Sequence, residues 1–164
     1  MTPEQDDLLC KTFPLLYADR NTSMQETCMC WGFCCGSGWF QLIWGLSEKL
    51  EAIIEKLPAN RCVCGCDTSM HLEHRCQGVF TFKGKSTECG CSRFCPDRPR
   101  ASQLKEKFGM MRMYITTGTE EMYSLISEAE EKSGKICETC GADGEIISDH
   151  GWLKTRCEAH VEDR

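Results

Sequence analysis

The chain lacks several features that would place it in a common class of protein. Its first seven residues carry three acids and no basic residue, and no apolar run follows, so we expect no secretory signal. It has no glycine-rich phosphate-binding loop and no dinucleotide-binding fingerprint. The uncharged segment 27–47 contains four glycines and four cysteines, which argues against a membrane span. We therefore expect a cytoplasmic protein without membrane contact.

Cysteine, in contrast, is abundant, at fifteen of 164 residues. In a protein that is not exported, disulfides are disfavoured and clustered cysteines are typical of metal sites. The odd number also excludes complete pairing within one chain. The net charge is −6, yet residues 61–118 hold ten bases and five acids. Metal-bound thiolates would offset part of this local positive charge.

The strongest pattern lies at the C-terminus. Cys137-x-x-Cys140 is followed, after sixteen residues, by Cys157-x-x-His160. Each short pair lets two side chains reach the same ion, and together the four satisfy tetrahedral zinc. Because four protein ligands leave no position for substrate, we expect one zinc ion in a structural zinc ribbon.

A second segment rich in cysteine and histidine lies in the middle of the chain. Its nine candidate ligands are Cys62, Cys64, Cys66, His71, His74, Cys76, Cys89, Cys91 and Cys95. Eight ligands saturate two zinc ions, and a bridging thiolate accommodates a further ligand. We therefore predict two zinc ions here, with an iron–sulfur cluster as the alternative. The pattern does not decide which histidine binds.

The remaining cysteines and the tryptophans have more ordinary interpretations. A third cysteine group consists of Cys28, Cys30, Cys34 and Cys35. We expect buried thiols there, with another metal site as the alternative. Cys10 is expected in the core, on the first helix. The four tryptophans are expected in the core as well, because they are not interleaved with lysine or arginine as base-stacking residues would be.

Catalytic motifs are weak. His71-x-Glu73 matches the first half of the zinc nucleobase-deaminase signature, but the Pro-Cys-x-x-Cys half is missing because Ile136 precedes Cys137. A cysteine nucleophile with a histidine base is allowed by composition, although nearly every histidine belongs to a metal set. Residues 105–107 are interpreted as charged pairs on an exposed helix. We expect a protein that is not an enzyme.

Periodicity and capping residues predict the other elements. Helices are expected over residues 2–18, 37–57 and 120–132, with Pro14 interrupting or kinking the first and Thr117 opening the third. Strands are expected at Val79–Phe82 and around Met111–Ile115, and a hairpin between the C-terminal ligand pairs.

Three short motifs extend over both ends of the chain. They are Trp31-Gly32-Phe33 with Cys35-Gly36-x-Gly38-Trp39-Phe40-x-Leu42-Ile43; Ala101–Gly109 with Arg112 and Tyr114; and Ala129-Glu130-x-x-Ser133 with Cys137-Glu138-x-Cys140-Gly141, Gly151-Trp152, Thr155, Cys157 and His160. In this order they resemble a family of uncharacterised bacteriophage zinc-ribbon proteins. The resemblance implies a phage origin and no particular activity. Ser37 departs from it, since the family usually has Asp there, and residues 61–99 look like an elaboration of a simpler region.

These observations predict an α+β protein with a small helical and strand core, a C-terminal zinc ribbon and an inserted Cys-rich zinc module. The expected parts are the helical residues 1–60, the insertion 61–99 and the strand, helix and ribbon of 100–164. We expect a phage-encoded zinc-binding protein that binds, and inhibits or modulates, a host protein such as a defence complex. One alternative is a nucleic-acid-binding zinc protein in phage replication or expression, which the basic middle segment supports. The other is a zinc-dependent enzyme.

Overall fold

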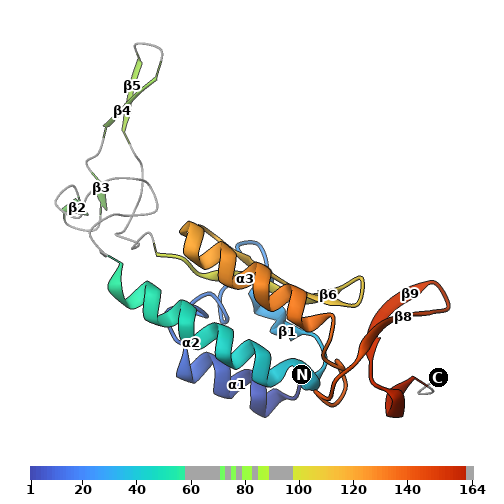
Figure 1. The fold of residues 1–164 in the computed structure, drawn as a ribbon. Helices are drawn as coiled ribbons and strands as arrows, with labels where there is room; N and C mark the ends of the chain where they lie inside the picture. The colour runs from blue at the N-terminus through green and yellow to red at the C-terminus, as the bar shows by residue number, and fades with distance from the viewer. Residues whose placement is uncertain (58–70, 73–74, 77–78, 83–84, 89–97, 162–164) are drawn as a thin grey trace. The chain divides into compact units, whose positions relative to one another are not determined.

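The structure is a computed structural model that describes residues 1–57, the strand residues 71–72, 75–76, 79–82 and 85–88, and residues 98–161 (Figure 1). The chain divides into two compact units, one of Met1–Glu55 with Pro99–Arg164 and one of Lys56–Arg98. The first unit combines α-helices, a mixed sheet and a separate hairpin, so its class is α+β. None of the helices in the described residues is long and apolar enough to cross a membrane.

Helices in the first unit begin at recognisable caps. α1 is Pro3–Thr12, α2 is Phe40–Lys56 and α3 is Glu120–Ser133, with 3-10 turns at Cys28–Trp31 and Ser37–Trp39. The capping box predicted at Thr2 is confirmed, since Thr2 and Gln5 exchange hydrogen bonds. The cap of α3 is Thr119, which accepts from the N–H of Met122, and not the predicted Thr117.

The first helix ends earlier than the sequence pattern predicts. α1 stops at Thr12 rather than near residue 18, because Pro14 has no N–H and disfavours helical backbone in the residue before it. The next two N–H groups, of Leu15 and Leu16, donate instead to the two carboxylate oxygens of Glu51, at 2.9 and 2.8 Å. Glu51 is buried on α2, so this pair of bonds joins the turn to that helix.

Three strands form the sheet of the first unit, in the order β1-β6-β7. β1 (Phe33–Cys34) runs parallel to β6 (Ala101–Lys107), which forms an antiparallel hairpin with β7 (Met110–Ile115). The prediction that residues 105–107 lie on a helix is wrong, since they belong to β6. Apolar residues in β6 are spaced as in a helix because a β-bulge after Ala101 interrupts the alternation.

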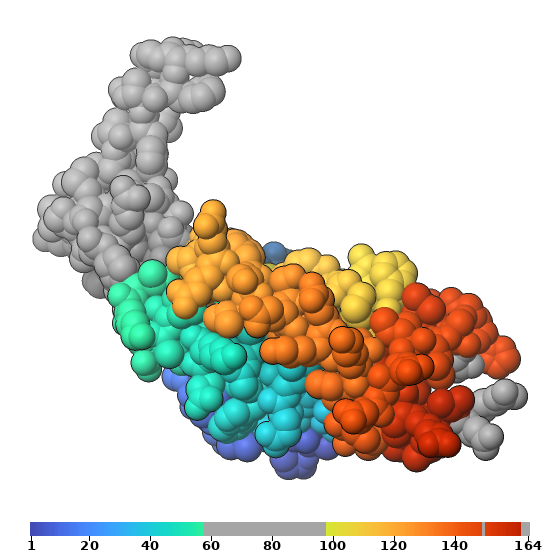
Figure 2. Space-filling view, viewed as in Figure 1, coloured from blue at the N-terminus to red at the C-terminus, as the bar shows by residue number. Residues whose placement is uncertain are grey.

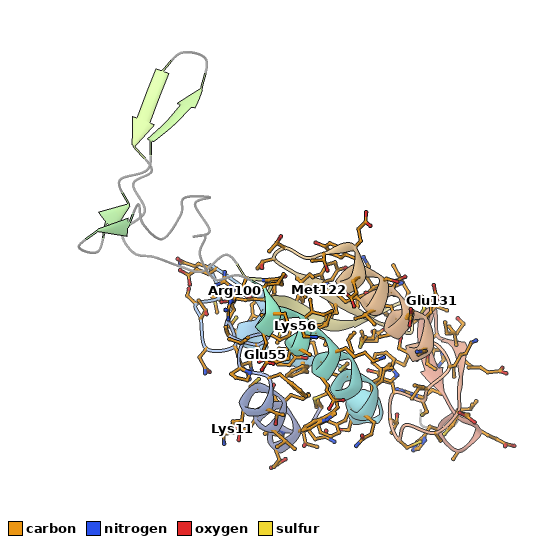
Figure 3. All side chains as sticks on the ribbon, turned by 60° about the vertical axis from the view of Figure 1, so that its left-hand side comes forward. Lys11, Glu55, Lys56, Arg100, Met122 and Glu131 are labelled. Carbon is orange, nitrogen blue, oxygen red and sulfur yellow. The ribbon has the colours of Figure 1, made fainter. Side chains whose placement is uncertain are left out.

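Apolar side chains from the helices and the sheet form one core. Its largest fully buried members are Leu9, Leu16, Met29, Trp39, Ile43, Leu50, Ile54, Leu104, Met111 and Met122. Figure 3 labels Met122, which α3 buries in this core, and Glu131, which the same helix exposes. This alternation around α3 is the amphipathic pattern that the sequence predicts.

Two tryptophans contradict the prediction that all four pack in the core. Trp39 is fully buried and Trp44 packs edge-on against Phe13, but Trp31 is 59% exposed and Trp152 is 76% exposed. The thiols differ as well. Among Cys28, Cys30, Cys34 and Cys35 only Cys35 is buried, Cys34 is exposed, and Cys10 is half-buried against the core.

The second unit contains two short antiparallel pairs in its described residues. β2 (His71–Leu72) pairs with β3 (Arg75–Cys76), and β4 (Val79–Phe82) pairs with β5 (Lys85–Glu88). The predicted strand Val79–Phe82 is therefore confirmed.

Candidate metal centre

The C-terminal segment folds into the predicted hairpin. β8 (Glu145–Asp149) pairs antiparallel with β9 (Trp152–Arg156), and the 3-10 turn Glu158–His160 follows. A bridge between Ile136 and Asp143 closes the chain around the first Cys-x-x-Cys turn. Strand pairing thus returns the second ligand pair to the first, although the two are far apart in sequence.

Local hydrogen bonds shape both ligand turns. In the first, the N–H of Cys137 donates to the carbonyl of Ala142 at 2.7 Å, and the N–H of Gly141 donates back to the carbonyl of Cys137 at 2.8 Å. Gly141 has φ +82°, a left-handed conformation that glycine adopts without steric cost. In the second, the N–H of His160 donates to the carbonyl of Cys157 at 2.9 Å. Each turn therefore points its two side chains the same way.

The four ligand atoms converge closely enough to share one metal ion. The Sγ atoms of Cys140 and Cys157 are 3.6 Å apart, and Nδ1 of His160 lies 3.1 Å from Sγ of Cys157 and 3.7 Å from Sγ of Cys137. All four atoms lie within 4.8 Å of one another. Zinc–ligand bonds of about 2.3 Å to sulfur and about 2.0 Å to nitrogen imply tetrahedral edges of about 3.5 to 3.8 Å. The four residues can therefore hold one metal ion.

Electrostatics favour a thiolate at the first ligand. Burial raises the pKa of the Cys137 thiol, but backbone N–H groups of Cys140, Cys157 and Thr139 point at its sulfur and outweigh burial, so its pKa falls to about 6. The pKa of Cys157 is raised, by desolvation and by hydrogen bonds with the thiols of Cys140 and Cys137. A cation at the centre favours the thiolate form of every one of these cysteines.

The first ligand turn packs directly on residues 36–39, which comprise the 3-10 turn just before α2 and its N-cap residue. The N–H of Gly36 donates to Oε1 of Glu138 at 2.9 Å, and the N–H of Gly38 donates to the carbonyl of Glu138 at 2.8 Å. The indole N–H of Trp39 donates to the carbonyl of Ile136 at 2.8 Å. A Cβ atom on Gly36 or Gly38 would lie 2.2 or 2.1 Å from a backbone oxygen of this turn. Only glycine allows so close an approach.

The structure brings together the four C-terminal ligands that the sequence predicts, Cys137, Cys140, Cys157 and His160. Of the middle set, Cys62, Cys64, Cys66, His74, Cys89, Cys91 and Cys95 lie outside the described residues. For His71 and Cys76 the structure describes only the backbone, and these two residues pair with each other between β2 and β3. The two zinc ions predicted for this segment stay a prediction.

Among the described residues, the third cysteine group has no partners with which it would form a ligand cluster. In the part of the chain that the structure describes, no set of three or more Cys, His, Asp or Glu side chains other than the C-terminal one converges on a common point. The hydrogen bonds of these thiols are local, since Sγ of Cys30 donates to the carbonyl of Thr27 at 3.2 Å. The alternative of a metal site at Cys28 to Cys35 therefore gains no support from the described residues.

Sequence reasoning missed the residues that support the ligands. Glu138 lies between two cysteines of the Cys-x-x-Cys pair, where any polar residue would suit an exposed turn. The available signal was the pair Gly36 and Gly38 just before a helix, because glycines at alternate positions often mark a close backbone approach. Nothing in the sequence indicates which segment approaches them.

Fold and site together define an α+β protein with a Cys3His cluster that can hold a metal ion. Comparison of the chain with protein-family models, with curated proteins and with solved structures finds no match.

Proposed function

We propose that Cys137, Cys140, Cys157 and His160 hold one zinc ion as a structural centre, and that the chain is a zinc-binding interaction protein without enzymatic activity. The convergence of four ligand atoms within 4.8 Å carries this proposal. Zinc bound by four protein side chains has no open coordination position, so it stabilises structure rather than activating water. The ion replaces the thiol–thiol contacts and fixes the hairpin to the helical core through Glu138.

Metal analysis of the purified protein tests this centre. Protein prepared without added metal or chelator is analysed for zinc and iron per chain, beside Cys140→Ser. The variant is expected to carry one zinc ion fewer than the wild type, because serine is a poor zinc ligand. Cys34→Ser, which alters an exposed cysteine that does not belong to the cluster, is the matched control and should keep the full zinc content. Iron in place of zinc would contradict the proposal.

A host protein is the partner that the sequence leads us to propose. This rests on the resemblance to phage proteins and on the acidic net charge of −6, which favours association with a basic surface. The exposed ring of Trp152 supplies the kind of aromatic anchor that protein interfaces use. A purified host protein that forms a stoichiometric complex with the wild type, and binds Trp152→Ala far more weakly, would support it. If the wild type and Trp152→Ala recover the same host proteins in pull-downs, the result would argue against this proposal.

Nucleic-acid binding is the second candidate, and one observation favours it. Lysines and exposed aromatic rings are neighbours on β6, on β7 and at the tip of the C-terminal hairpin. Surfaces that bind single-stranded nucleic acid typically combine aromatic rings with cations that form no ion pair. The sequence alone does not reveal this arrangement.

A further inference from the structure

The turn between β6 and β7 contains an aromatic residue that folding does not explain. Phe108 and Gly109 form a two-residue loop between the paired residues Lys107 and Met110. Phe108 has φ +56°, a left-handed conformation that is costly for a bulky side chain and that Asn would adopt readily. The residue is 64% exposed, so burial does not compensate for this cost. Such a residue points to a role in binding.

A second exposed ring lies beside this turn, on the C-terminal hairpin. The hydroxyl of the buried Thr155 on β9 donates to the carbonyl of Gly109 at 2.5 Å, which fixes the two hairpins together. Phe108 then lines one shallow cleft with Trp152 and Leu153. Figure 2 shows the two hairpins adjoining, with the β6–β7 turn in yellow and the C-terminal hairpin in red. The hairpin that carries the metal ligands thus places Trp152 next to Phe108.

Two lysines stand over aromatic rings along the same sheet. Nζ of Lys105 lies 5.5 Å from the ring centroid of Tyr114, and Nζ of Lys107 lies 5.3 Å from that of Phe108. The pairing of β6 with β7 places Lys105, Lys107 and Tyr114 on one face, and Tyr114 is 43% exposed. Within the described part of the chain neither lysine forms an ion pair, although the protein has a net charge of −6.

The acid between the two lysines is already bound. Oε1 of Glu106 accepts the N–H of Gly109 at 2.7 Å, inside the turn. Its strand position pairs with the buried Met111, on the side opposite the lysines. Glu106 also lines the cleft with Lys107, Phe108 and Trp152, so the positive charge that a ligand meets lies on the face of β6 that carries Lys105 and Lys107.

We infer that this surface, made of Lys105, Lys107, Phe108, Tyr114 and Trp152, binds single-stranded nucleic acid. Phosphates contact the lysines, and unpaired bases stack on the exposed rings. The inference rests on the second candidate function and names its ligand. Charge favours this occupant, because two cations beside exposed rings suit a polyanion with flat bases. A host protein anchored on Trp152 is the other outcome of the test. A duplex hides its base faces and cannot use the rings.

Fluorescence anisotropy with a labelled oligo-dT of twelve nucleotides tests this surface at low and moderate salt. We expect salt-dependent binding by the wild type. The double variant Lys105→Ala/Lys107→Ala should reduce the slope of log K against log salt by about 1.4, because each lysine that neutralises a phosphate of a single strand adds about 0.7 to that slope. Trp152→Ala should weaken binding about 5- to 150-fold, as expected for one stacked base.

Phe108→Asn separates binding from folding. Asparagine suits the positive φ of the turn, so the melting temperature should hold or rise, while affinity for oligo-dT falls. A purely structural Phe108 would leave affinity unchanged. Lys49→Ala, an exposed lysine on α2 without an ion pair among the described residues, is the control and should bind as the wild type does.

Three outcomes overturn the inference: no binding at low salt, equal weakening in Lys49→Ala and the double variant, or a duplex bound as tightly as oligo-dT. A surface that serves a host protein gives the first of these. Zinc is measured in every preparation, so a protein that keeps its zinc but ignores oligo-dT refutes this inference alone. Wild-type protein without zinc refutes the proposed metal centre instead.

Discussion

The helix-and-sheet core and the C-terminal hairpin reach a fixed structure by different means. In the core, side chains such as Trp39, Leu50 and Met111 are fully buried, and each helix contributes apolar residues to one cluster. From residue 136 to 161 only Cys137 and Thr155 are buried among the described side chains. Ile136 and Ile147 are half-buried, and the other large apolar residues are exposed, namely Ile146, Trp152, Leu153 and Val161. The hydrophobic effect therefore accounts for the first region and not for the second.

This difference predicts where the proposed zinc ion acts. A hairpin of two short strands is marginally stable alone, so the hairpin needs its ligand cluster and its contacts with the core. Structural zinc contributes about 10 kcal/mol or more of binding free energy in small domains. We expect the metal to determine the order of the hairpin while leaving the core nearly unchanged.

Removal of one ligand should give the largest effect. In Cys140→Ser the hairpin is expected to lose most of the zinc contribution, on the order of 10 kcal/mol, and to open locally. Hydrogen exchange followed by mass spectrometry should show fast exchange over residues 145–156 and near-normal protection over α2. Equal deprotection of both regions would mean that the metal supports the whole unit and that the two regions are not independent.

A core variant should produce the opposite pattern. Glu51→Gln leaves one of the N–H groups of Leu15 and Leu16 facing an amide NH2 group, since only one oxygen remains to accept. We expect a loss of about 2 to 3 kcal/mol in the free energy of unfolding, measured by urea denaturation, with zinc content unchanged. Glu48→Gln, on an exposed position of the same helix, is the control and should lie within about 0.5 kcal/mol of the wild type.

The packing between the two regions can be tested at one glycine. Gly38→Ala places a Cβ atom 2.1 Å from the carbonyl oxygen of Cys137, so either backbone must shift. We expect a loss of about 1 to 3 kcal/mol, with faster exchange in the hairpin than in α1. In Gly45→Ala nothing lies within 4 Å of the new atom, and the helix should gain about 0.5 to 1 kcal/mol. Equal changes in the free energy of unfolding for Gly38→Ala and Gly45→Ala would contradict the role of the first ligand turn in joining the two regions.

Sequence patterns predict structure best where residues close together in the chain determine it. The spacing of Cys137, Cys140, Cys157 and His160 indicates the cluster, because ligands in pairs need only short turns and one hairpin to meet. The period of α2 and the Val79–Phe82 strand likewise follow from neighbouring residues. Their physical basis lies within a few positions of the chain.

The failures arise where distant contacts decide. Lys105 to Lys107 favour helix locally, but pairing with β1 and β7 places them in the middle strand of a sheet. The carboxylate of Glu51 binds N–H groups thirty-five and thirty-six positions away, which no local pattern reveals. Trp152 has a large apolar side chain, which favours burial, but the fold places it at the tip of a hairpin, where it is exposed.

Alkylation of cysteines should perturb the structure least, and its rate should distinguish buried from exposed thiols in the first unit. Burial raises the pKa of Cys35 to about 12; burial, and then the negative charge of Asp6, raises the pKa of Cys10 to about 12 as well. Cys34, the neighbour of Cys35 in sequence, is exposed. Because only the thiolate reacts, iodoacetamide at pH 8 should label Cys34 much faster than Cys35 or Cys10, as followed by peptide mass spectrometry.

The same two thiols give core stability a pH dependence of definite sign. In the unfolded chain the thiols ionise with a pKa near 9, whereas in the native core they stay protonated until the pH approaches 12, so core stability should fall as pH rises between these values. Cys35→Ala removes one of the two titrating groups and should make that decline shallower, measured by urea denaturation from pH 8 to 10. An unchanged slope would contradict the assigned titration of Cys35. Equal labelling rates of Cys35 and Cys34 in the folded protein would show that the core around Cys35 opens readily.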